Sequence, residues 1–179
     1  ATGGEGGKYS WCKAPRYENL PAETGPLAQM LATKDPLFTD LVTPSGANTW
    51  VRQLARMARP ARMLPAILSW IDDVAAGQQK YFNDYKHIDD GEGYGVVEAP
   101  RGFLGHWLKV ANNRIHRYQI ITPTAWNASP RDGSGRRGPI EEALIGTPVR
   151  DPKDPIEVEY VIRSFDPCLV CTVHVIDTA

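Results

Sequence analysis

The hydrophobic periodicity of this chain changes near residue 90. Between residues 48 and 86, apolar residues recur at steps of three and four, the spacing of a helix face. Between residues 93 and 123, β-branched and aromatic residues form short runs separated by turn signals, as in strands. The sequence therefore predicts an α+β fold, with helical segments and a small antiparallel sheet.

Prolines are expected to limit the helices. Residues 1–46 carry five prolines between Pro15 and Pro44 and are predicted to be turn-rich. Pro60 is expected to interrupt the first long helix, because proline removes a backbone donor and clashes with the preceding turn. We interpret the apolar faces, including Leu68, Ile71 and Val74, as core. The helical pieces predicted before residue 90 cover residues 25–33, 48 to about 59, 64–77 and 81–85.

The second half of the chain is expected to hold the sheet and two short helices. Asn112-Asn113 is a plausible hairpin turn. A polar, glycine-rich loop at residues 128–138 separates the sheet from the helices. The predicted strands cover residues 94–98, 106–110 and 114–122, and the predicted helices cover residues 139–144 and 155–163.

Two of the three cysteines lie one turn apart in the segment SFDPCLVCTVH (residues 164–174). Thiolates bind soft or borderline metals such as nickel, iron and zinc. Asp166-Pro167 is a helix-start signal, with aspartate as the cap and proline in the first position. The motif therefore predicts half of a metal site on a C-terminal helix, with Cys168 and Cys171 in its first turn and His174 on the same face.

The motif alone leaves alternatives open. Structural zinc needs four ligands, usually from two such pairs, and the pair could equally be buried and redox-inert. A thioredoxin-like motif is disfavoured, since no short βαβ pattern precedes it. The residues that could complete a metal site, none of them with ligand spacing, are Cys12, His87, His106 and His116.

The wider sequence resembles nickel–iron hydrogenase large subunits. Residues 166–174 resemble the C-terminal motif DPCxxCxxH of that family. Further matches, in the order of the family, are GGEGGKYSW (3–11), KAPRY (13–17), GPLA (25–28), EAPRG (98–102), LGHW (104–107) and PTAWNASPRD (123–132). The resemblance implies that residues 1–179 are the C-terminal portion of a large subunit, with helices from its helix bundle. An earlier Cys-x-x-Cys motif of the family is absent, which implies a split subunit or a fragment.

The resemblance also implies a nickel–iron centre with carbonyl and cyanide ligands. Cys168 matches a terminal nickel thiolate, and Cys171 matches a thiolate that bridges to iron. His174 and the backbone carbonyl of Ile120 match ligands of a magnesium or similar divalent ion near the C-terminus. The remaining thiolates would come from an N-terminal large-subunit portion, which is therefore an expected partner.

Further matches imply the surroundings of this centre. Arg101 matches an arginine held over the open side of the metals, and Asp166 is expected to pair with it. With Cys168, these are the expected catalytic residues. Pro123 and Thr124 match the segment that holds a cyanide ligand of the iron. The expected cofactor-binding residues are Pro100, Leu104, Pro123 and Thr124.

The implied function is that of an enzyme, a hydrogenase that cleaves or forms dihydrogen heterolytically. The expected direction is uptake, with electrons passing to an iron–sulfur small subunit, since three cysteines cannot hold a cluster chain as well as nickel. The main alternative is a dihydrogen-sensing regulatory subunit. A relative from quinone-reducing respiratory complexes is disfavoured by the intact Cys168 and Cys171, and a zinc-binding interaction module is the residual alternative.

Composition excludes several other classes. The net charge of −1 gives no reason to expect a nucleic-acid partner. Three cysteines do not form a disulfide framework, and no apolar run is long enough for a membrane span. We expect a cytoplasmic location, with a periplasmic or membrane-associated one through the partner as the alternative.

Overall fold

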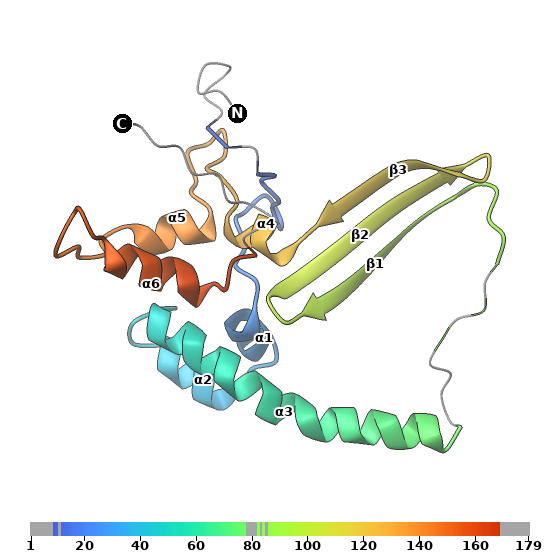
Figure 1. The fold of residues 1–179 in the computed structure, drawn as a ribbon, viewed down its shortest axis with the longest axis horizontal. Helices are drawn as coiled ribbons and strands as arrows, with labels where there is room; N and C mark the ends of the chain where they lie inside the picture. The colour runs from blue at the N-terminus through green and yellow to red at the C-terminus, as the bar shows by residue number, and fades with distance from the viewer. Residues whose placement is uncertain (1–8, 11, 78–81, 83, 85, 169–179) are drawn as a thin grey trace.

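The computed structural model describes residues 9–10, 12–77, 82, 84 and 86–168. Helices and a single small sheet make up this part of the chain, in agreement with the predicted α+β class (Figure 1). The elements in chain order are α1 (Pro26–Ala32), α2 (Pro36–Val42), α3 (Thr49–Ala75), β1 (Gly91–Ala99), β2 (Gly102–Ala111), β3 (Arg114–Ile121), α4 (Pro123–Asn127), α5 (Pro139–Leu144) and α6 (Ile156–Ser164).

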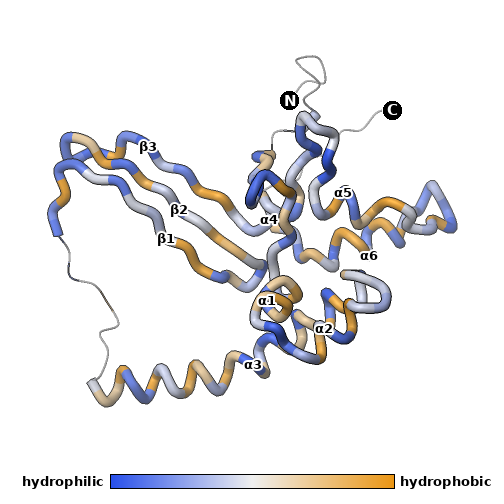
Figure 2. The backbone as a smooth tube through the Cα atoms, turned by 180° about the vertical axis from the view of Figure 1, so that it is seen from behind, coloured by the Kyte–Doolittle hydropathy of each residue, from blue (hydrophilic) through white to orange (hydrophobic). Residues whose placement is uncertain are grey.

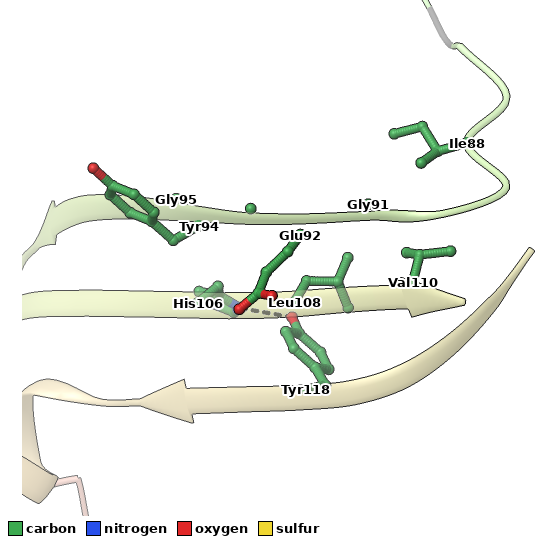
Figure 3. A pocket seen from close by; sticks show the side chains of 10 residues that line it. Ile88, Gly91, Glu92, Tyr94, Gly95, His106, Leu108, Val110 and Tyr118 are labelled. Atoms are coloured by element: carbon green, nitrogen blue, oxygen red, sulfur yellow. Dashed lines mark hydrogen bonds between the residues drawn. The ribbon is translucent and has the colours of Figure 1, made fainter.

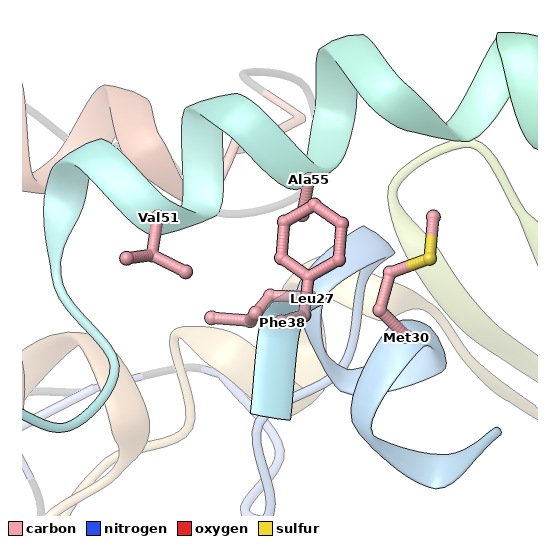
Figure 4. Packing of buried hydrophobic residues seen from close by; sticks show 5 residues of the cluster. All are labelled: Leu27, Met30, Phe38, Val51 and Ala55. Atoms are coloured by element: carbon pink, nitrogen blue, oxygen red, sulfur yellow. The ribbon is translucent and has the colours of Figure 1, made fainter. Parts of the chain in front are cut away.

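The described core lies where α1, α2 and the first half of α3 meet. Figure 4 shows the ring of Phe38 lying beneath Ala55, with neighbouring side chains from all three helices. Helix α2 was missed by the sequence analysis, although Asp35-Pro36 is a start signal and Asp35 Oδ1 accepts a hydrogen bond from the Phe38 N–H at 3.4 Å. The buried apolar cluster consists of Leu27, Met30, Phe38, Val51 and Ala55.

Helix α3 runs without a break through Pro60 and Pro65. The predicted interruption at Pro60 was therefore wrong. A proline deletes one helical hydrogen bond, but its fixed φ of about −65° is itself helical, so flanking turns can carry the helix past it. The helix expected near residues 81–85 was also wrong where the structure describes it, because residues 82 and 84 are not helical.

The three strands form one antiparallel sheet in the order β1-β2-β3. Asn112 and Asn113 form the β2–β3 turn with φ of 51° and 56°, as expected for a two-residue hairpin with two left-handed positions. Ala99 pairs with Gly102, so Pro100 and Arg101 form the tip of the β1–β2 hairpin. The strands, the Asn-Asn turn and the helices near residues 139–144 and 155–163 are thus confirmed.

The second half of α3 projects beyond the packed part of the molecule (Figure 1). Its apolar residues were predicted to be core, yet Leu68 and Ile71 are 62% and 57% exposed. Figure 2 shows hydrophobic colour recurring along this helix. We call these residues the α3 stripe: Leu64, Ile67, Leu68, Ile71 and Val74. Among the described residues, no helix combines the length and apolarity that crossing a bilayer requires.

Candidate metal centre

The chain enters the Cys-x-x-Cys motif through a sharp turn after α6. Ser164 is fully buried and Phe165 closes the helix. Asp166 then adopts a φ of 50°, in the left-handed region that costs a non-glycine residue about 1–2 kcal/mol. Residues 166–168 are not helical. The expected helix beyond Cys168, including Cys171 and His174, lies outside the described residues.

Asp166 pairs with Arg101, as expected from the resemblance. The Nε atom of Arg101 lies 3.3 Å from Oδ2 of Asp166, and these side chains are 48% and 37% exposed. The hairpin of β1 and β2 presents Arg101 at its tip, whereas Asp166 comes from the turn that leads to Cys168. Two segments about 65 residues apart in sequence therefore meet within two residues of the expected nickel ligand.

Helix α4 fixes the backbone of Cys168. The Cys168 N–H donates to Oγ1 of Thr124 at 3.0 Å. Thr124 is buried, with 3% of its surface exposed. Thr122 caps α4 by accepting from the Ala125 N–H at 3.3 Å. A hydroxyl that accepts one hydrogen bond still has a proton to donate, so Thr124 can hold Cys168 and bond a further acceptor. Pro123 is buried beside it.

A loop before α1 packs against the Arg101 hairpin. The side-chain amide of Asn127 donates to the Thr24 carbonyl and accepts from the Thr24 N–H, both at 2.9 Å. A Cβ atom on Gly102 would lie 2.5 Å from Thr24 Oγ1 and 2.7 Å from the Gly25 nitrogen. Gly102 also has a φ of 132°, so glycine is required here on both counts.

Three arginines of α3 reach this region, and the sequence analysis missed them. Arg52 and Arg59 are each 7% exposed, and Nε of Arg56 lies 3.8 Å from Oδ2 of Asp166. Burial lowers the pKa of Arg56, the charge of Arg101 lowers it further, and Asp166 opposes both. The available signal was their spacing of four and three residues, which puts all three on one helix face.

The other described residues that were expected at the site are Pro100, Leu104 and Ile120. Pro100 shares the hairpin tip with Arg101 and is exposed, and Leu104 is partly buried on β2. The Ile120 carbonyl accepts from Nε2 of Gln119 at 2.9 Å; a carbonyl oxygen has a second lone pair for a metal. The roles given to these residues stay predictions.

Cys12 is partly buried and lies outside the Cys-x-x-Cys motif. Burial raises the pKa of its thiol, which favours the protonated form over the thiolate that binds metal. Within the described ranges, no group of three His, Cys, Asp or Glu side chains could hold a metal ion. The described part thus offers Cys168 as one prospective donor, and a complete set must draw on residues elsewhere.

A hollow lies over the sheet. It has a volume of about 360 Å³ and lies over β1 and β2, between Ile88 and Tyr118 (Figure 3). There His106 Nδ1 and the Tyr118 hydroxyl lie 2.6 Å apart, which makes Tyr118 the hydrogen-bond partner of His106. Neither Ile120 nor Cys168, the described residues expected at the metal site, lines this hollow.

Comparisons with known proteins agree with the motif-based resemblance. A family model described as nickel-dependent hydrogenase matches residues 2–174. The periplasmic NiFeSe hydrogenase large subunit of Desulfomicrobium baculatum is 40% identical over 192 residues, covering 95% of this chain and 36% of that protein. The quinone-reactive Ni/Fe-hydrogenase large chain of Wolinella succinogenes is 40% identical over 196 residues, covering 97% and 33%.

The fold gives the same result. The reduced Ni-Fe-Se hydrogenase of Desulfovibrio vulgaris Hildenborough matches with a TM-score of 0.80 and 39% identity, covering 96% of this chain and 39% of that one. This chain spans about a third of the length of the two curated relatives. With a family model over nearly its whole length, the chain belongs to the nickel-dependent hydrogenase large subunit family.

Proposed function

We propose that this chain is the C-terminal, nickel-binding portion of a hydrogenase that interconverts dihydrogen with protons and electrons. The observation that carries the proposal is the Arg101–Asp166 ion pair, which lies two residues before Cys168. A hydrogen bond from its own N–H fixes the backbone of that cysteine against the buried Thr124. A cysteine held two residues from an arginine–aspartate ion pair is a suitable environment for a redox-active metal.

The donor chemistry fits a nickel–iron centre. A thiolate is a soft donor, and Cys168 is only partly buried, so its sulfur remains available. We infer that Cys168 and Cys171 would hold a nickel–iron centre with carbonyl and cyanide ligands. His174 and the Ile120 carbonyl would hold magnesium or a similar ion. When bound, the nickel–iron centre supplies the redox chemistry and the site at which dihydrogen is split.

The residues of this chain would then handle charge and protons. Arg101 presents a rigid, permanently charged fork that can polarise a ligand in a site shielded from water. Asp166 orients this fork by its ion pair at 3.3 Å. Sγ of Cys168 would be the acceptor for a proton released at that centre. The Thr124 hydroxyl proton, with Pro123 beside it, is available to a cyanide nitrogen.

Two partners complete this assignment. The remaining two thirds of a large subunit would supply the other thiolates, and the exposed α3 stripe is a surface for it to cover. An iron–sulfur small subunit would accept the electrons. One relative, from Bradyrhizobium diazoefficiens, is named an uptake hydrogenase large subunit and is 38% identical, which supports the uptake direction. Another is named periplasmic, so the preference for the cytoplasm stays a prediction.

Metal analysis of the purified complex tests the proposal. We expect about one nickel per copy of this chain and reduction of an artificial electron acceptor by dihydrogen. A turnover far below that of an energy-conserving enzyme, with nickel present, would favour a dihydrogen sensor. Zinc in place of nickel, in a closed tetrahedral site, would reject the proposal.

Substituting Arg101→Lys should reduce turnover while nickel and assembly are kept. Lysine preserves the charge but loses the planar fork, and losing one preorganised donor typically costs about 10²–10³ in kcat. Steady-state kinetics of the assembled complex measure the change. Arg131→Lys is a matched control, since Arg131 is exposed and contacts the Tyr9 ring rather than the metal motif. Unchanged turnover in Arg101→Lys would remove this arginine from the mechanism.

A further inference from the structure

Three arginines on one face of α3 are turned toward the loops that meet at the metal motif. Arg52, Arg56 and Arg59, which we call the arginine row, are spaced by four and three residues. Arginine side chains are rarely buried unless they are paired. Arg62, one turn further along, has the ordinary exposure, with 57% of its side chain accessible, and pairs with Asp35. The burial of the arginine row therefore needs partners, which the structure supplies for Nη atoms of all three arginines, whereas Nε of Arg56 and of Arg59 has no hydrogen bond among the described residues.

Arg59 holds the strand that leads to Arg101. Its Nη1 donates to the Ala99 carbonyl at 2.8 Å, and its Nη2 donates to the Glu98 carbonyl at 3.1 Å. Two donors of one rigid guanidinium on consecutive carbonyls fix both the position and the direction of that backbone. Only Pro100 separates these carbonyls from Arg101. The position of the hairpin tip is thus set by α3.

Arg56 holds the other half of the ion pair. Its Nη1 donates to the Ser164 carbonyl at 2.9 Å, and its Nε lies 3.8 Å from Oδ2 of Asp166. The same carboxylate oxygen lies 3.3 Å from Arg101, so two guanidiniums share one acceptor. Since Asp166 has a left-handed φ, these contacts also help to hold a backbone conformation that is unfavourable by itself.

Arg52 connects the loop before α1 to the same helix. It donates from Nε and Nη2 to the two oxygens of Glu23, both at 2.8 Å. Its guanidinium carbon lies 4.1 Å from the centre of the Phe165 ring, directly before Asp166. Gly25, two residues after Glu23, lies close to the Arg101 carbonyl. Arg52 therefore restrains both sides of the Arg101–Asp166 pair.

We propose that the arginine row consists of positioning residues, which hold Arg101 and Asp166 in register with Cys168 by tying their loops to one rigid helix. The inference rests on the proposed function, because it assigns the row to the nickel-dependent reaction. It makes the geometry around Cys168 depend on a helix that contributes no ligand. Misplacing a reacting group by about 1 Å can cost about 10² in rate. Loss of this positioning should therefore lower kcat.

A double-mutant cycle in the assembled complex tests the row. We expect Arg56→Met to lower kcat about tenfold in the otherwise unchanged complex, but less than about twofold when Arg101 is already lysine. A residue that acts through Arg101 must show this loss of effect, whereas a merely stabilising residue would lower kcat by the same factor in both backgrounds. Hydrogen exchange should quicken at residues 98–102 and 164–168 and stay unchanged in the first half of α3.

Two further variants make every outcome decisive. Arg62→Met, a matched control on the same helix, should leave kcat and exchange unchanged. Arg56→Lys should keep assembly and nickel content and show the same dependence on Arg101. Equal factors in both backgrounds, or loss of assembly in both Arg56 variants, would overturn the positioning role. A parent complex without nickel or dihydrogen turnover would instead reject the proposed function itself.

Discussion

Replacing Cys168 by alanine should abolish both nickel retention and dihydrogen-dependent activity of the assembled complex. Nickel in a thiolate site needs each sulfur donor, and alanine offers no donor atom in place of the lost thiolate. The backbone around Cys168 is held by its bond to Thr124, so the chain itself should still fold. Elemental analysis of the purified complex, together with the rate of acceptor reduction by dihydrogen, measures the result.

The control for this substitution is a cysteine of similar exposure. Cys12 is partly buried, and burial favours its protonated form, so Cys12→Ala should leave nickel content and activity within about twofold of the parent. Cys171→Ala should match Cys168→Ala. Equal losses in all three variants would show that the ligand assignment is wrong, because a ligand and a non-ligand cannot have the same effect.

Local sequence signals predicted the elements whose geometry is decided locally. The Asn112-Asn113 turn requires two positive φ values, which asparagine tolerates better than most residues, and the hairpin followed. The break predicted at Pro60 was wrong, and α3 also continues through Pro65 in its exposed second half. Proline costs a helix about 3 kcal/mol, but its fixed φ is itself helical. A local signal cannot weigh these two terms against each other.

The resemblance to known large subunits predicted the Arg101–Asp166 pair, and the arginine row shows what a motif leaves out. Arg59 lies in no matching segment, and its sequence neighbours do not distinguish it from exposed Arg62. Its burial follows from the hairpin carbonyls of Glu98 and Ala99, which are about 40 residues away in sequence. The tertiary fold determines which carbonyls lie within reach of such an arginine. The sequence pattern indicates only that the arginines share a helix face.

The exposed α3 stripe indicates what kind of partner covers it. Leu64, Ile67, Ile71 and Val74 are separated by steps of three, four and three, which is the spacing of a seam between packed helices. Periodicity predicted this face to be core, whereas it is exposed in this chain, and no element in the described part of the chain lies against it. Because this chain spans about a third of its relatives, we expect helices of the remaining large-subunit portion to pack there.

Placing a charge in the α3 stripe should therefore prevent assembly with that portion. Ile71 is 57% exposed in this chain alone, so Ile71→Asp should change its own stability by no more than about 0.5 kcal/mol. In a helix interface the carboxylate would be buried without a partner, at a cost of several kcal/mol, and about 3 kcal/mol already corresponds to roughly a hundredfold weaker association.

Co-purification of this chain with the remaining large-subunit portion measures the effect of Ile71→Asp. Ser69→Asp is the matched control, because it introduces the same charge two residues earlier, on the opposite face of the helix. We expect the Ser69 variant to assemble normally and the Ile71 variant to remain unassembled and without nickel. Normal assembly of both variants would mean that the stripe faces solvent in the complete enzyme. Loss of a homodimer, with the large-subunit portion still bound, would instead identify a second copy of this chain as its partner.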